Sequence, residues 1–252
     1  MQGTCRRRRW VVAQCAGWLA ALGVLGCAPS PAPPPASAQS PAPDGSHNAQ
    51  VKADLEAMLG ISYDTFTEEL GSTLRPANQE MTEASDLFFK DGGRAFNPDH
   101  AERASELFES AARRVAGLKA RRAKAWRTLP ILFVQLDYVA AKADNGLAMI
   151  AFSRGELDEM SRQLAGLLEL ADQVFDTIAQ ELQIGLLPKE HPLYRRVQDE
   201  LADMSVKAHL LLGLECKRRG EVAQARAHWQ KGLDRARGEE MRRPLRRLLD
   251  DR

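Results

Sequence analysis

From Val51 to the end of the chain, apolar residues recur at intervals of three and four positions in almost every window. No segment in this region alternates apolar and polar residues with a period of two, which is the pattern of a half-buried strand. A spacing of three or four places side chains on one face of an α-helix. The sequence therefore predicts an all-α domain over residues 51–252.

Local signals indicate where the expected helices begin and end. Gly60 ends the first helix, since glycine readily adopts the left-handed conformation found after a helix. Thr65 with Glu68 forms a capping box, and Pro76 suits the first turn of a further helix. These and similar signals predict helices at residues 50–59, 65–73, 76–90, 98–127, 130–153, 156–183, 192–219, 221–237 and 239–250.

The N-terminal part of the chain has a different composition. Arg6–Arg9 precede an apolar run that ends at Gly26, which is the order of segments in a secretory signal peptide. Residues 28–50 hold seven of the thirteen prolines and few large apolar side chains. Such a composition cannot bury a core, so this stretch is predicted to be a disordered tether.

The end of the apolar run, Leu22–Cys27, resembles the lipobox of bacterial lipoproteins, in which a small residue precedes a cysteine that becomes lipidated. This resemblance implies a signal peptide over residues 1–26, a lipidated Cys27 at the start of the linker 27–50, and anchoring through the acyl chains. In proteobacterial lipoproteins an aspartate after the cysteine signals inner-membrane retention. Ala28 here implies the outer membrane, facing the periplasm. The alternatives are an ordinary cleaved signal peptide and an uncleaved anchor.

Charge and cysteine content exclude one class of partner and one kind of covalent stabilisation. The chain has 35 Lys and Arg against 34 Asp and Glu, and loss of Arg6–Arg9 leaves an acidic excess. A general nucleic-acid binder carries a basic excess, so no nucleic acid is expected as a partner. Once Cys27 is lipidated and the signal peptide removed, Cys216 is the only remaining thiol, which excludes an internal disulfide.

The segment His209–Ala225, continued to Trp229, resembles a tetratricopeptide repeat. Leu212–Gly213 match the Leu-Gly pair of the first helix, and Gly220 occupies the turn. Ala225 matches the small residue where the two helices touch, and Trp229 matches the aromatic side chain that wedges between them. The usual tyrosine and the terminal proline of the repeat are absent here.

Two further units are more degenerate. A shift of 65 residues aligns Leu147, Arg154, Gly155, Glu156, Leu168 and Ala171 with Leu212, Arg219, Gly220, Glu221, Leu233 and Ala236. A third candidate unit, with a longer turn around Gly92, runs from Ala84 to Ala111. The resemblance implies antiparallel helix pairs stacked as a short tetratricopeptide-like solenoid after the tether. The alternative is an irregular helical bundle.

In that family, the first helices of the pairs line a concave groove. The facing positions map here to Met81, Ser85, Phe88, Lys142, Asn145, Met149, Phe152, Lys207, Leu214 and Arg218. Apolar anchors beside basic groups suit an acidic or C-terminal peptide. The alternative for the phenylalanine and methionine positions is burial in the core.

Residues 113–127 carry seven basic residues and no acidic one. A basic amphipathic helix of this kind can lie on anionic lipid or meet an acidic partner. The alternative is a solvated helix face whose arginines pair with nearby glutamates.

The sequence contains none of the usual catalytic or phosphate-binding motifs, and its histidines lack metal-ligand spacing. We therefore expect no catalytic residue, no metal, and no cofactor apart from the lipid on Cys27. The layout resembles tetratricopeptide lipoproteins, which implies an adaptor or scaffold for an envelope protein or peptide. The alternatives are a ligand-binding accessory lipoprotein of a tripartite periplasmic transporter and a cell-wall enzyme.

Overall fold

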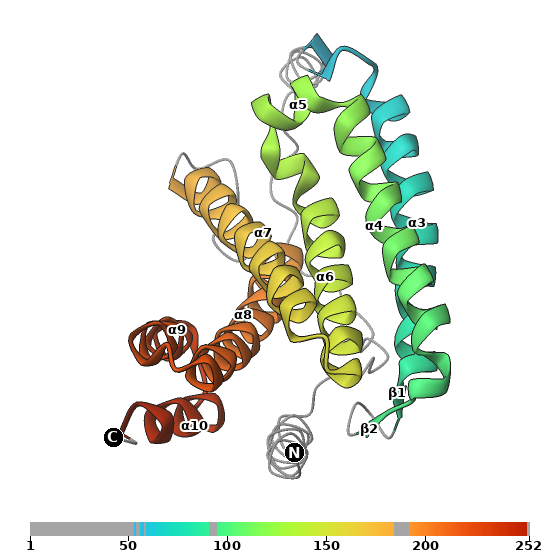
Figure 1. Ribbon diagram of the computed structural model, residues 1–252. Helices are drawn as coiled ribbons and strands as arrows, with labels where there is room; N and C mark the ends of the chain where they lie inside the picture. The colour runs from blue at the N-terminus through green and yellow to red at the C-terminus, as the bar shows by residue number, and fades with distance from the viewer. Residues whose placement is uncertain (1–52, 54–55, 58, 91–94, 184–191, 251–252) are drawn as a thin grey trace, which may run out of the picture.

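The computed structural model describes residues 53, 56–57, 59–90, 95–183 and 192–250 (Figure 1). The predicted signal peptide, Cys27 and the tether lie outside these residues. Within them the chain is almost wholly helical, which confirms the predicted all-α class. The helices are α3 (Tyr63–Phe88), α4 (Ala101–Arg121), α5 (Ala123–Thr128), α6 (Val134–Arg154), α7 (Leu157–Gln183), α8 (Pro192–Arg219), α9 (Val222–Arg235) and α10 (Glu239–Asp250).

A single helix, α3, replaces the two helices expected at 65–73 and 76–90. Its N-cap is Ser62 rather than Thr65, and the Ser62 hydroxyl accepts a hydrogen bond from the backbone N–H of Thr65 at 3.1 Å. Pro76 lies inside the helix and removes one backbone hydrogen bond. Packing against α4 and α6 offsets this loss by burying one stripe of the helix: Phe66, Thr73, Ala77, Met81, Ala84 and Phe88.

A short hairpin that the sequence did not predict joins α3 to α4. Its strands are β1 (Phe89–Lys90) and β2 (Ala95–Phe96), paired antiparallel with Phe89 opposite Phe96. The rings of Phe88 and Phe96 stack with their centroids 5.1 Å apart, and the Phe89 ring meets both edge-on. Two-residue strands are too short to show alternation. A 3₁₀ turn, η1 (Pro98–His100), then leads into α4.

The helix expected at 98–127 ends earlier than predicted. Arg122 caps α4, the short α5 follows, and a 3₁₀ turn, η2 (Pro130–Phe133), leads into α6. Leu129 leaves the helical region, with φ −133° and ψ 58°. The residue before a proline is pushed out of the helical conformation by the proline ring, which explains this break.

The two glycine turns predicted at a spacing of 65 residues have the same geometry. Gly155 ends α6 with φ 76° and Gly220 ends α8 with φ 84°, both in the left-handed region. In each turn the N–H of the following glutamate donates to the carbonyl five residues earlier, at 2.9 Å. This is the Schellman arrangement, and it reverses the chain so that the next helix runs back along the previous one.

The helices pack largely in chain order (Figure 1). The three closest associations are the antiparallel pairs α3 with α4, α6 with α7, and α8 with α9. Between pairs, α4 packs against α6 and α7 against α8, and α10 covers α9. In the described part of the chain, no helix is long and apolar enough to cross a membrane.

Trp229 of α9 packs against α8 in the last helix pair. Its side chain is 2% exposed and lies directly against Gly213 of α8. A Cβ atom at Gly213 would lie 2.2 Å from Nε1 of Trp229, so only glycine allows the indole this position. Around it, a small cluster of α8, α9 and α10 side chains forms a core separate from the main one.

Candidate interaction surface

Four of the expected groove residues lie in the protein core. Met81, Phe88, Met149 and Phe152 are at most 6% exposed and belong to the main hydrophobic cluster. Their assignment to an exposed groove is therefore wrong, and the alternative of core packing holds. The reason is clearest for α6, which contacts α3, α4, α7 and α8 and is covered on several sides.

Two more of these residues lie near the end of α8. Leu214 is half-buried against both hydrophobic clusters. Arg218 is exposed, but its guanidinium donates two hydrogen bonds to Glu215 one turn earlier, at 2.7 and 2.6 Å. Burial raises the pKa of Glu215, but hydrogen bonds from Arg218 and Arg219 outweigh this and lower the pKa overall. The charge of Arg218 is thus paired with a carboxylate of its own helix.

Lys142 of α6 lies where α6 meets α8, beside the carboxylate of Glu200. Its Nζ is 3.9 Å from Glu200, which also accepts hydrogen bonds from the Tyr138 hydroxyl and, at 2.8 Å, from Arg196. Burial raises the pKa of Glu200, but these hydrogen bonds and the charges of Lys142 and Arg196 lower it overall. Glu200 is therefore ionised at neutral pH and ties the two helices together.

Lys207 of α8 and Asn145 of α6 are half-buried. Lys207 lies 65 residues after Lys142, the same offset that separates the turn glycines Gly155 and Gly220. Burial lowers the pKa of Lys207, and the charge of Asp203 one turn earlier opposes this shift. No carboxylate of the described residues forms an ion pair with Lys207, which leaves this ammonium group able to accept an anionic partner.

These residues share one face of each helix. Tyr138, Lys142 and Asn145 follow a spacing of i, i+4, i+7 on α6, which places them on one side of that helix. The corresponding face of α8 carries Arg196, Glu200, Asp203 and Lys207, at i, i+4, i+7, i+11. We refer to these seven residues as the α6–α8 surface. It carries three positive charges and two negative ones, and on α8 the carboxylates of Glu200 and Asp203 lie between Arg196 and Lys207.

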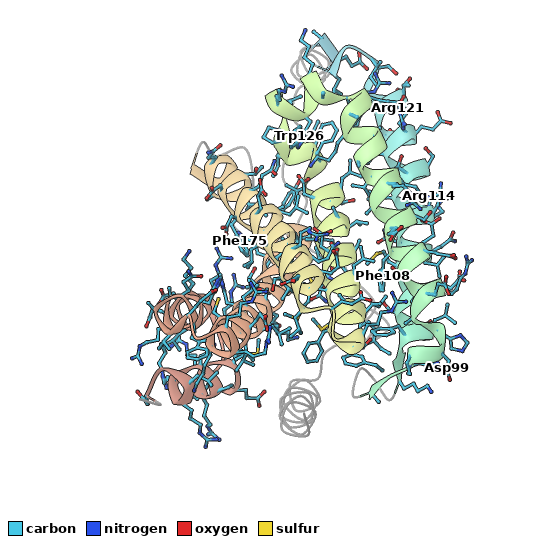
Figure 2. All side chains as sticks on the ribbon, viewed as in Figure 1. Asp99, Phe108, Arg114, Arg121, Trp126 and Phe175 are labelled. Atoms are coloured by element: carbon cyan, nitrogen blue, oxygen red, sulfur yellow. The ribbon has the colours of Figure 1, made fainter. Side chains whose placement is uncertain are left out.

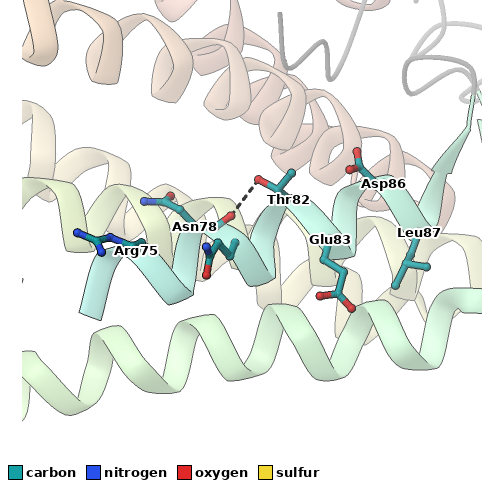
Figure 3. A pocket seen from close by; sticks show the side chains of 7 residues that line it. Arg75, Asn78, Thr82, Glu83, Asp86 and Leu87 are labelled. Carbon is teal, nitrogen blue, oxygen red and sulfur yellow. Dashed lines mark hydrogen bonds between the residues drawn. The ribbon is translucent and has the colours of Figure 1, made fainter. Parts of the chain in front are cut away.

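A hollow of about 740 Å³ runs along the exposed face of α3 (Figure 3). Asn78, Thr82 and Asp86 recur every four residues along it, and the Thr82 hydroxyl donates to the Asn78 carbonyl at 2.9 Å. The described residues that line it are Arg75, Asn78, Gln79, Thr82, Glu83, Asp86 and Leu87. The groove positions inferred from the repeat resemblance, Met81 and Ser85, each lie one residue before a polar residue of this stripe. The regular polar spacing of the stripe is visible in the sequence.

The basic segment 113–127 forms the end of α4 and most of α5, where Figure 2 labels Arg114, Arg121 and Trp126. Four of its seven basic residues pair with carboxylates on described helices, which is the alternative that the sequence left open. The pairs are Arg113 with Glu109, Arg114 with Glu80, Lys119 with Asp137, and Arg122 with Glu69. Pairing of this kind fixes α4 against α3 and α6 and leaves fewer unpaired cations that could bind an anionic membrane surface.

Searches against known proteins give no relative for this chain. No family model matches it, and neither a curated protein nor a solved structure is significantly similar to it. In the part of the chain that the structure describes, no three histidine, cysteine, aspartate or glutamate side chains are grouped as metal ligands would be. The function must therefore be inferred from the surfaces of the chain itself.

Proposed function

We propose that this protein is a lipid-anchored adaptor of the bacterial envelope that binds another protein or peptide and performs no reaction. Cys27 carries the lipid in the outer membrane, and the proline-rich linker holds the helical domain away from the bilayer on the periplasmic side. The three helix pairs act as a short tetratricopeptide-like solenoid, in which α3, α6 and α8 are the first helices.

The observation that carries this proposal is the α6–α8 surface. Lys142 and Lys207 occupy equivalent positions on successive first helices, and Glu200 lies beside Lys142 at the junction. A fixed arrangement of positive and negative charges favours a partner with the complementary pattern and disfavours others. Lys207 supplies a half-buried cation for a carboxylate of the partner, because a charge-assisted hydrogen bond gains strength away from bulk water.

We expect a photo-crosslinking amino acid at Asp203 to capture one envelope protein reproducibly in cells. Asp203 is exposed on the α6–α8 surface, whereas Gln230 is exposed on α9 and serves as the control position. Reversing the charge of Lys207 with Lys207→Glu should reduce the captured amount on the order of tenfold, the effect of about 1.4 kcal/mol. The matched variant Arg226→Glu changes an exposed charge on α9 and should leave capture unchanged. Equal capture from both crosslinking positions, or by both charge variants, would contradict the proposed surface.

The lipid anchor has its own test. We expect Cys27→Ala to move the folded domain from the membrane fraction to the soluble fraction, because acyl chains contribute ~0.8 kcal/mol of membrane affinity per methylene. Immunoblotting of fractionated cells measures this distribution. Cys216→Ala removes the half-buried thiol of α8 and should leave the protein on the membrane. A Cys27→Ala protein that stays wholly membrane-bound would refute lipidation as the anchor.

A further inference from the structure

Two histidines face each other between α8 and α9. The Nδ1 atoms of His209 and His228 are 3.2 Å apart, which is hydrogen-bond distance. His209 is only 4% exposed and His228 is half-buried. A bond between two ring nitrogens needs one protonated donor and one unprotonated acceptor, so at least one of the rings must be neutral for the contact to hold.

The charges around this pair are mostly positive. Arg235 and Lys231 of α9 act on His209, and Asp172 of α7 is the only anion among the charges that act on it within the described residues. Asp172 is already paired with Arg235, whose guanidinium carbon also lies 5.7 Å from the centre of the Phe175 ring. A proton added to His209 therefore meets two cations and one anion that is already paired.

We propose that the His209–His228 pair is an acid-sensitive latch that holds α9, together with α10, against α8 and opens when both rings are protonated. One proton can be shared, because an imidazolium donates to a neutral imidazole and keeps the bond. A second proton leaves two donors facing each other with no acceptor. Trp229 directly follows His228 on α9, and Gly213 lies one turn after His209 on α8, so opening the latch also loosens the contact between the indole and Gly213.

The direction of the pH effect follows from the environment of the rings. Burial, reinforced by the charges of Arg235, His228 and Lys231, lowers the pKa of His209 from 6.5 to about 4. Burial and the charge of Lys231 also lower the pKa of His228. A histidine with a lowered pKa in the packed state binds protons better when released, so acid favours release. The state in which α9 is packed against α8 therefore loses stability as the pH falls from 6.5 toward 4. Above that range, both rings are neutral and do not change its stability.

Hydrogen exchange of the purified full-length chain at pH 7.5 and pH 5 tests the latch. From its pKa shift, His209 alone should increase the opening of α9 about 30-fold between these two pH values. After correction for the intrinsic pH dependence of exchange, α9 amides should lose protection by that factor, while α4 amides should change little. His209→Gln should remove most of the difference, His228→Gln should remove a smaller part because His209 stays buried, and His100→Gln, at an exposed position in η1, should preserve it.

Two results would overturn the latch. In the first, the His209→Gln and His228→Gln chains show the same acid-induced loss of α9 protection as the unmodified chain. The second applies even if the substituted chains fail to fold. In a nuclear magnetic resonance titration of the unmodified chain, the His209 ring would titrate near the ordinary value of 6.5, with α9 protection constant throughout.

Discussion

Replacement of Trp229 by alanine should lower the free energy of unfolding by about 3 to 5 kcal/mol, the range for truncating a buried tryptophan. The indole is 2% exposed and lies directly against Gly213, at a distance that leaves no room for a Cβ atom at that position. Removing it leaves a cavity between α8 and α9 that the rigid helix backbones cannot close. Lys217 also loses a cation–π contact, since its Nζ lies 5.8 Å from the centre of the Trp229 ring.

Chemical denaturation followed by circular dichroism measures this loss. Gln230→Ala is the matched control, because Gln230 is the next residue on α9 and its side chain is exposed. A surface change of this kind typically alters stability by no more than about 0.5 kcal/mol. If Trp229→Ala unfolds at the same denaturant concentration as the control, Trp229 does not have the packing role described here.

The features predicted correctly from the sequence are those fixed by local chemistry. Gly155 and Gly220 end helices because a positive φ is difficult for other residues, and this requirement is visible in the sequence itself. Pro76 shows the limit of such reasoning. The proline destabilises the helix locally by removing a backbone hydrogen bond, but the burial of apolar side chains along α3 outweighs this cost. That burial depends on packing against α4 and α6, whose positions the sequence does not specify.

Only Lys142, Asn145 and Lys207 of the proposed α6–α8 surface were among the groove positions expected from the sequence, for a related reason. On a helix, a shift of one residue rotates a side chain by about 100°. A repeat template placed one residue out therefore selects the buried Met81 instead of the exposed Thr82. Lys142 and Lys207 were less affected, because the charged end of a lysine is strongly favoured near solvent. The contact of His209 with His228 joins positions 19 residues apart and leaves no signal in the sequence.

Lys119→Met should lower the free energy of unfolding at pH 7.5 by about 3 to 5 kcal/mol, the cost of leaving a buried charge without its partner. Lys119 of α4 forms an ion pair with Asp137 of α6, and its Nζ lies 4.1 Å from the centre of the Trp126 ring. Asp137 is only 2% exposed, and burial raises its pKa even with Lys119 present. Without the ammonium group, the carboxylate has no described cation to compensate its charge.

The pH dependence and a second substitution separate charge from packing. An acid whose pKa is raised in the folded state binds its proton more tightly when folded, so its ionisation destabilises the protein as the pH rises. The loss in Lys119→Met should therefore shrink in acid. Adding Asp137→Asn should restore most of the stability at pH 7.5, because the amide carries no charge. Arg113→Met breaks an exposed pair with Glu109 and should cost less than about 0.5 kcal/mol. Equal losses in the single and the double Lys119 variants would show that the contact with Trp126, rather than the buried charge, is what Lys119 provides.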